Sequence, residues 1–347
     1  MSKQSKSIYK YRSGGIDSQD LKTIFERDLK SLVNNEIYAA TIKNLNDPCE
    51  GLISTDILMA QIDEMLKKNP QAIESMSIFK NELNNMLSHI DTSGIYSLSK
   101  NYLNELLWAH YANSHKGFCI EYDLDILLKL NNERTDINKN QLVDFDVVYN
   151  DKPYYLKSHD MNNLVDTRSF MSKLLGYKSE NWKYEDEIRI ICSQSGCIEY
   201  DYRAVKSIYF GLRMEEEQEI EIMKSLQGRR INYYKIQLKN NSYKFYAEPI
   251  QDKYQTDKNY LYSIAPIPEY IIKHTNYESN NYIRKAIEIV RREPHCNTIA
   301  NIKENEDNIE IFFFKELPII FKQKYTYHEI DKLFNNIDDL DMVDILK

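Results

Sequence analysis

Glycine scarcity limits the folds open to this chain. Only 9 of its 347 residues are Gly, against 27 Tyr, where average glycine usage of about 7% would give roughly two dozen. Phosphate-binding loops and dinucleotide fingerprints need Gly where the backbone turns tightly or approaches a pyrophosphate. Neither G-x-G-x-x-G nor G-x-x-x-x-G-K-S/T occurs in the sequence. The composition therefore argues against a Rossmann enzyme or a P-loop NTPase.

Charge and cysteine content narrow the function classes further. Lys and Arg total 45 and Asp and Glu 53, a net charge of -8, which disfavours a generally basic nucleic-acid surface but leaves a local basic cleft open. The five cysteines are scattered, with no C-x-x-C, so we expect reduced thiols and no metal site. The first residues lack the apolar run of a signal peptide, and no stretch approaches the length of a membrane span. We expect a cytoplasmic protein that does not bind a membrane.

Hydrophobic periodicity predicts an α+β fold, with strand and helix patterns in alternation. The opening residues predict a strand at 8–13 that stops at Gly14-Gly15, a helix capped by Asp17 or Ser18, and a strand at 36–42. Further strands are predicted at 95–99, 118–122, 142–149, 182–192, 205–210, 233–238 and 243–247. Further helices are predicted at 55–88 (broken at Asn69-Pro70), 103–116, 124–130, 153–178, 215–226 and 280–291. A hairpin is predicted at 298–314. We expect a core domain at 1–255 with a helical insertion at about 52–92, and a small α/β accessory domain at 256–347.

A charged segment at 182–192 is the strongest candidate for chemistry. If it is a strand, Glu185, Glu187 and Arg189 share one face while Ile188 and Ile190 share the other. Two carboxylates side by side at a cleft could divide labour, one stabilising positive charge and the other orienting or deprotonating an acceptor. By spacing alone, a solvated strand face with a Glu–Arg pair is the favoured interpretation.

Two other segments carry polar groups. Lys10, Tyr11 and Arg12 on the first strand could hold phosphate or ribose hydroxyls, although an exposed edge strand is favoured for this segment alone. Residues 45–51, Leu-Asn-Asp-Pro-Cys-Glu-Gly, predict a hydrogen-bonded turn with Glu50 pointing outward.

The segment at 95–122 combines a strand bearing Ser97 and Ser99 with the helix that follows it. Trp108 and Tyr111 are i,i+3 neighbours on this helix and are expected in the core. The two histidines, His110 and His115, are expected to be surface or hydrogen-bonded groups. Alone, none of these residues identifies a reaction.

Taken in order, the motifs resemble a bacterial family catalogued as a domain of unknown function, DUF2971. The residues that carry the resemblance are Tyr9-Lys-Tyr-Arg12, Asn46-Asp-Pro-Cys-Glu-Gly51, Leu107-Trp-Ala-His-Tyr111 with Gly117-Phe-Cys-Ile-Glu-Tyr122, Trp182-Lys-Tyr-Glu-Asp-Glu-Ile-Arg189 and Ile208-Tyr-Phe-Gly211. The resemblance covers roughly residues 8–250. It implies a bacterial protein associated with mobile elements or antiphage defence.

A more distant likeness is to ADP-ribosyltransferases, and it implies a mixed-sheet core with NAD as the substrate. The likeness makes Glu187 the carboxylate that stabilises the oxocarbenium-like ribose and Glu185 the group that activates an acceptor, which is water, protein or nucleic acid. Its remaining implied ligands fall into three kinds: Arg12 or Lys10 for the pyrophosphate, Ser99 or Ser97 for the ribose, and Tyr11 or Trp182 for stacking on a ring. We therefore expect Arg12, Ser99 and Glu187 to line one cleft.

Two other function classes stay open. In one, Asp47, Glu50, Glu185 and Glu187 gather around Mg²⁺ in a nucleic-acid-directed enzyme. In the other, the protein is a non-catalytic sensor or interaction module, for which abundant Tyr is suited. The C-terminal region is expected to bind a partner protein or regulate the core. Its Arg291-Arg292 pair is expected to complement a helix dipole and its acidic tail, 338–341, to be solvated.

Overall fold

The computed structural model describes residues 6–16, 18–135, 141–161, 167–256, 260, 264–315, 319–335 and 337. The chain forms two compact units, one from Met1–Leu128 with Asn140–Gln255 and the other from Lys129–Lys139 with Thr256–Lys347. Within the described ranges, none of the helices has the length and apolar character needed to cross a membrane.

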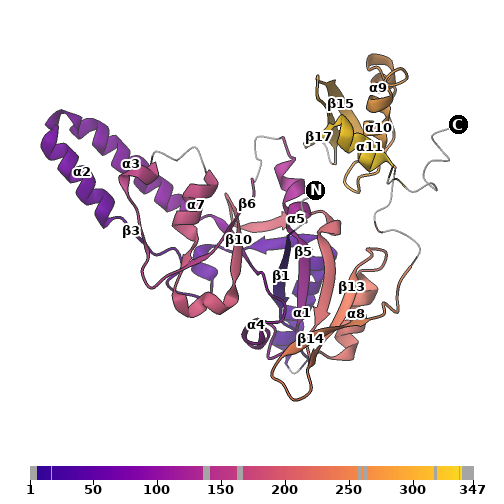
Figure 1. The fold of residues 1–347 in the computed structure, drawn as a ribbon, viewed down its shortest axis with the longest axis horizontal. Helices are drawn as coiled ribbons and strands as arrows, with labels where there is room; N and C mark the ends of the chain where they lie inside the picture. Colours follow the sequence, from indigo (N-terminus) through magenta and orange to yellow (C-terminus); the bar gives the residue numbers. More distant parts are fainter. Residues whose placement is uncertain are drawn as a thin grey trace. The chain divides into compact units, whose positions relative to one another are not determined.

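An eight-stranded mixed sheet forms the centre of the first unit (Figure 1). In spatial order its strands are β14 (Phe245–Ile250), β13 (Asn232–Leu238), β12 (Val205–Phe210), β5 (Phe118–Asp123), β1 (Ser7–Arg12), β4 (Gly94–Ser99), β10 (Glu187–Cys192) and β6 (Val143–Asp146). Every neighbouring pair is antiparallel except β12 with β13, which is parallel. The predicted α+β class with a mixed sheet is confirmed.

Helix α1 (Gln19–Val33) packs on one face of this sheet. The Ser18 side chain accepts a hydrogen bond from the backbone N–H of Leu21 and caps the helix, as its sequence position indicates. Phe25 and Leu32 are almost fully buried in the same apolar cluster as Ile8 of β1. Burying such a side chain contributes about 1.5–3 kcal/mol to stability. The apolar stripe of α1 therefore fixes the helix over β1, the strand that carries Lys10 and Arg12.

The central strands β1 and β4 diverge. Only Tyr9 and Ser99 are paired between them, whereas β1 pairs with β5 along its whole length, from Ser7 to Arg12. Beyond Tyr9 the two strands separate, and the gap is bridged by side chains, with Lys10 Nζ donating to the Ser97 carbonyl at 2.8 Å. This divergence opens the sheet beside the polar residues of both strands.

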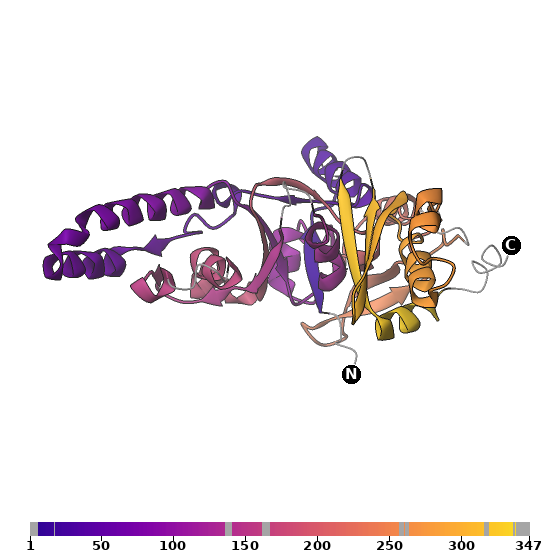
Figure 2. The same ribbon diagram turned by 90° about the horizontal axis from the view of Figure 1, so that it is seen from above.

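Between Glu50 and Gly94 the chain leaves the sheet as a helical insertion. It consists of β3 (Ile53–Ser54), α2 (Asp56–Lys68), a 3₁₀ turn at Pro70–Ala72 and α3 (Ile73–Ile90). The two helices form a hairpin that extends away from the sheet (Figures 1 and 2), and the break between them falls at Asn69-Pro70, as predicted.

Two predicted elements are wrong. The helix expected at 153–178 is instead β8 (Tyr154–Tyr155), α6 (Ser158–Met161), α7 (Thr167–Leu175) and β9 (Tyr177–Lys178). Helix α7 ends at Leu175, one residue before Gly176, a residue type that is unfavourable inside a helix, and Lys178 lies on the separate strand β9. The strand expected at 182–192 begins only at Glu187. Before it lies the 3₁₀ helix η3 (Glu180–Glu185), which ends at Asp186 in the left-handed conformation with φ 43°, a region that Asp tolerates.

The remaining elements of the first unit surround the sheet. They are β2 (Glu36–Ala39) paired with β11 (Gly196–Glu199), η1 (Ile42–Asn44), α4 (Glu105–Tyr111), α5 (Leu124–Asn132, which continues into the second unit), β7 (Val148–Tyr149) paired with β9, η4 (Tyr202–Ala204) and α8 (Glu216–Ser225). The sequence did not indicate β11, since its short segment shows no clear alternation.

The described residues of the second unit form a three-stranded antiparallel sheet and three helices. Strands β15 (Thr298–Glu304) and β16 (Asn308–Phe314) form the predicted hairpin, and β17 (Ile320–Thr326), α9 (Glu269–His274), α10 (Asn281–Val290) and α11 (Tyr327–Phe334) complete the unit. Arg291 and Arg292 both bind the carboxylate of Glu288 near the end of α10. The two guanidinium groups therefore neutralise this buried carboxylate. The acidic tail, 338–341, lies outside the described residues.

Candidate functional site

A cavity of about 820 Å³ opens where β1 and β4 diverge, within the range of 300–1,000 Å³ that is typical of small-molecule sites. Its walls come from β1, α1, β4, α4, β9 and β10, from the loop around Glu50, and from the end of η3. Among the residues that line it are Lys10, Tyr11, Arg12, Ser97, Ser99, Glu185 and Glu187. Arg12, Ser99 and Glu187 thus lie in one cleft, although β1, β4 and β10 are distant in sequence.

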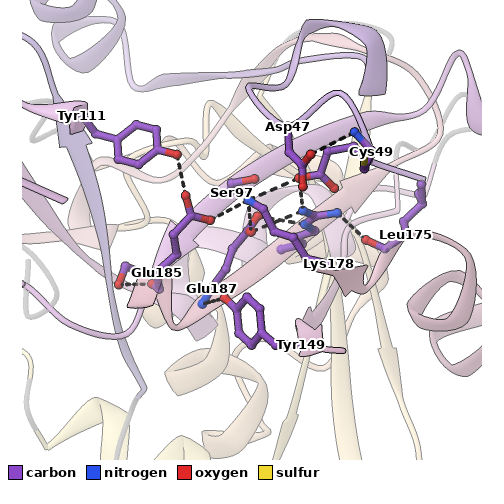
Figure 3. A network of polar contacts seen from close by, with 12 residues as sticks. Asp47, Cys49, Ser97, Tyr111, Tyr149, Leu175, Lys178, Glu185 and Glu187 are labelled. Carbon is purple, nitrogen blue, oxygen red and sulfur yellow. Dashed lines mark hydrogen bonds and ion pairs between the residues drawn. The ribbon is translucent and has the colours of Figure 1, made fainter. Parts of the chain in front are cut away.

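Three carboxylates surround the ammonium group of Lys178 at one end of the cavity. Lys178 Nζ lies 2.6 Å from Glu185 Oε2, 3.2 Å from Glu187 Oε2 and 3.3 Å from Glu50 Oε1. All four side chains are at most 7% exposed. Figure 3 shows Lys178 between the glutamates, with Tyr111 pointing at Glu185 from the opposite side. The expected solvated strand face is therefore wrong for Glu187, which is buried in an ionic network.

Arg189 anchors Glu187 from beneath the same network. Its Nε donates to Glu187 Oε1 at 2.8 Å, its Nη2 donates to Glu50 Oε1 at 2.7 Å, and its Nη1 donates to the Leu175 carbonyl at 2.5 Å. Glu187 and Arg189 share a strand face, as the alternation predicts. Since an isolated buried charge is costly, the opposite charges around these groups are what allow them to be buried.

The two catalytic candidates differ in their affinity for a proton. Burial raises the pKa of Glu187, but Arg189, Lys178 and a hydrogen bond from Ser97 outweigh it and lower the pKa to about 2. Burial also raises the pKa of Glu185, and here Lys178 and Tyr111 do not overcome it, so that its pKa stays above the usual range. Glu187 is consequently a permanent anion, and Glu185 is the carboxylate that can exchange a proton nearer neutral pH.

Neighbouring elements fix the backbone around Glu185 and Glu187. Tyr111 on α4 donates to Glu185 Oε1 at 2.5 Å, and the backbone N–H of Glu187 donates to the Tyr149 hydroxyl at 2.8 Å. Ser99 donates its hydroxyl to the Glu185 carbonyl at 2.7 Å. Ser99 therefore holds the turn between η3 and β10, and this backbone bond occupies its only donor.

Cationic side chains line the part of the cavity that β1 and α1 form. Lys10 and Arg12 project from β1, and Arg27 and Asp28 from α1. Asp28 Oδ1 accepts from Arg27 NH2 at 2.9 Å and lies 3.8 Å from Arg12 NH1. Arg12 NH2 donates to the Tyr96 hydroxyl at 3.3 Å, while its buried Nε has no partner. Burial, followed by the neighbouring Arg12, lowers the pKa of Lys10 to about 7.

The other proposed ligands lie in different surroundings. Tyr11 lines the cavity, but its hydroxyl donates to the Asn101 carbonyl at 2.7 Å and its ring packs on Trp108. Trp182 lies outside the cavity lining, with its ring centroid 4.8 Å from Lys178 Nζ. Trp108 is fully buried, as expected for core packing.

Sequence reasoning missed three parts of the site: Glu50, Lys178 and Tyr111. Glu50 was expected to point outward, and this is wrong, because it is buried against Arg189 and Lys178. Asp47 does form the expected turn, accepting from the Cys49 N–H at 2.9 Å. Lys178 lay within a predicted helix, and Tyr111 was assigned to the core. Only the i,i+2 spacing of Glu187 and Arg189 signalled a pair in advance.

Comparison with known proteins supports the resemblance to DUF2971 over part of the chain. Neither curated proteins nor solved structures gave a match to the chain. A family model does match, over residues 107–190, and this span holds Tyr111, Lys178, Glu185, Glu187 and Arg189. Lys10, Arg12 and Glu50 precede it, so the matched span is narrower than the motifs suggested. Residues 107–190 are thus similar to the family described as "Protein of unknown function (DUF2971)".

Proposed function

We propose that the protein binds NAD and breaks its nicotinamide–ribose bond, as an ADP-ribosyltransferase or an NAD glycohydrolase. One observation carries the proposal: a single cavity is lined by the cationic side chains of Lys10 and Arg12 and by two carboxylates of different proton affinity, Glu185 and Glu187. NAD has the matching polarity, with an anionic pyrophosphate at its centre and a cationic nicotinamide ring on the ribose.

The cationic side chains would bind the pyrophosphate. The Arg12 side chain lines the cavity and is 17% exposed, and an oxygen of a phosphate group would accept a hydrogen bond from its guanidinium group. Arg12 and Lys10 stand on the same face of β1, two residues apart. A phosphate in this position would also favour the charged form of Lys10, because an opposite charge stabilises an ammonium group.

The carboxylate end would carry the reaction. As the C1′–N bond breaks, its electron pair stays with nicotinamide and positive charge develops on the ribose, where the permanently ionised Glu187 would stabilise it. The acceptor's oxygen or nitrogen then bonds to C1′, and its proton passes to Glu185. Glu185 suits this role because a general base works best with a pKa close to the operating pH.

A magnesium-dependent reaction at the same residues has less support. The ammonium of Lys178 already occupies the position between Glu50, Glu185 and Glu187 that a cation would take. One oxygen of the fourth proposed ligand, Asp47, is held by its own turn. A non-catalytic protein could bind NAD at the same cavity, and it would differ from the proposed enzyme only in releasing no nicotinamide.

The proposal is tested by incubating purified protein with NAD labelled in its adenine half, with and without cell extract. Free nicotinamide is measured by chromatography, and label is followed onto protein and nucleic acid. Nicotinamide release with label on an acceptor identifies a transferase, and release with free ADP-ribose identifies a glycohydrolase. Folded protein that neither binds NAD nor releases nicotinamide, even with extract present, would overturn the proposal.

A further inference from the structure

Lys178 is the best-connected group at the carboxylate end of the cavity, and no sequence motif singled it out. Its side chain is 6% exposed and contacts three carboxylates. Although burial opposes it, Glu187, Glu185 and Glu50 raise the pKa of Lys178. Lys178 is therefore charged, and its backbone is held by the strand pair β7–β9, in which it pairs with Tyr149 and its carbonyl accepts from the Asn150 N–H at 2.9 Å.

The contacts of Glu185 show what Lys178 does for the site. One carboxylate oxygen, Oε1, accepts from Tyr111 at 2.5 Å, and the other, Oε2, from Lys178 at 2.6 Å. These two donors come from α4 and β9 and hold the carboxylate from opposite sides. Glu187 does not depend on Lys178 in this way, since Arg189 donates to both of its oxygens.

We propose that Lys178 is a positioning residue that clamps the Glu185 carboxylate against Tyr111 and beside Glu187, and so sets the pH range in which Glu185 accepts a proton. The reaction that Glu185 serves rests on the proposed function, but the clamp itself depends only on the contacts of Lys178 and Tyr111 with Glu185. It assigns Lys178 no direct contact with the reacting atoms.

The direction of the effect follows from the groups that face Glu185. These are Lys178 from β9, Tyr111 from α4, Glu187 from β10, Tyr149 from β7, Tyr184 from η3 and Lys10 from β1. Among them, Lys178 is the cation in hydrogen-bond contact. Removing it leaves burial and the anion Glu187, both of which raise the pKa of Glu185. Glu185 would then stay protonated to higher pH, by about one to three units, the usual effect of losing a close opposite charge.

The direct test is a carbon-13 NMR titration of protein labelled at the glutamate side-chain carboxyl carbons, with the Glu185 signal assigned by its loss in Glu185→Gln. The midpoint of Glu185 is expected to rise by at least about one pH unit in Lys178→Met, and to stay near its original value in Lys178→Arg, which keeps the charge. Lys173→Met is the matched control, because Lys173 forms a similar ion pair, 2.7 Å from the buried Asp160, outside the cavity. It should lower stability without moving the midpoint.

A measurement on the unmodified protein covers the case in which Lys178→Met does not fold. The nitrogen-15 signal of the Lys178 ammonium should shift with the same midpoint as the Glu185 carboxyl carbon, because the two groups are in contact. Independent midpoints, or a Glu185 midpoint that is the same in folded Lys178→Met, would overturn the inference. These titrations need no NAD. If the protein shows the coupled midpoints but releases no nicotinamide, only the proposed function is contradicted. If the protein does release nicotinamide, the acid limb of its pH–rate profile should move with the Glu185 midpoint.

Discussion

Glu50 Oε1 accepts a hydrogen bond from Arg189 NH2 at 2.7 Å, although the two residues are 139 positions apart. Glu50 immediately precedes the helical insertion, and Arg189 lies in the middle of β10. The contact therefore ties the base of the insertion to the strand that carries Glu187. Both residues are buried, so the pair belongs to the structural framework of the cavity.

The Glu50–Arg189 pair should be strongly coupled in stability. Arg189→Met leaves buried carboxylates with a missing partner, and we expect it to lower the free energy of unfolding by about 3–5 kcal/mol. In the Arg189→Met background, Glu50→Gln should cost less than it does alone, or even restore stability. Urea unfolding of both single variants and the double variant measures a coupling energy expected to exceed about 1 kcal/mol. Additive effects would show that the contact is energetically irrelevant.

Acid should remove the stabilisation that Glu187 provides. Its pKa is about 2 in the folded protein, below the ordinary value of 4.5, so its ionic contacts contribute fully above pH 4.5 and are lost as the pH falls toward 2. The lost contribution is on the order of 3 kcal/mol. The difference in unfolding free energy between wild type and Glu187→Gln should therefore be full at pH 7, shrink below pH 4.5 and change most as the pH approaches 2. A difference that does not change with pH would contradict the low pKa.

Lys10 should also make stability rise with pH, in a separate window on the alkaline side. With a folded pKa near 7 against an ordinary value of 10.5, the unfolded chain holds a proton between these values that the folded protein lacks. Stability relative to Lys10→Met should consequently rise with pH in this window, by up to about 1.4 kcal/mol per unit. The exposed Lys43, which pairs with Asp91, gives a control variant, Lys43→Met, whose relative stability should not follow this slope.

Loss of the Arg12 guanidinium should weaken NAD binding more than it affects the fold. A hydrogen bond to a charged group is worth about 1.5–3 kcal/mol, so Arg12→Met should raise the dissociation constant for NAD about 10- to 100-fold. Calorimetric titration in a Glu187→Gln background avoids turnover during the measurement. Arg168→Met, which removes a guanidinium that is 61% exposed and pairs with Asp144, is the control. Equal affinities for the Arg12 and Arg168 variants would exclude a pyrophosphate at Arg12.

Local patterns predicted the fold better than they predicted the site. The helix capped by Ser18 and the strands β1, β4 and β5 follow directly from short-range periodicity and capping. Lys178 was placed in a helix because the pattern from 153 to 178 was interpreted as one helix that runs through Gly176. The helix ends at Leu175, and Gly176 was a local signal for that end, because glycine is unfavourable inside a helix.

Burial of charge was equally hidden in the sequence. Glu50 follows a turn motif and carries no sign of its partners, which are supplied by β9 and β10. The alternation at 187–189 did predict that Glu187 and Arg189 share a face, and the structure shows them hydrogen-bonded. It could not show that the face is buried, because burial depends on Lys178, Leu175 and the Glu50 loop arriving from elsewhere in the chain.

The rate of nicotinamide release from NAD by wild type, Glu187→Gln and Glu180→Gln tests the central claim most directly. Glu180 is an exposed carboxylate of η3 that pairs with Lys183, so its variant controls for a lost glutamate near the site. We predict measurable release by wild type and Glu180→Gln, and a loss of at least about 100-fold in Glu187→Gln, the usual effect of removing a group that stabilises transition-state charge. Folded Glu187→Gln protein with undiminished release would contradict the account.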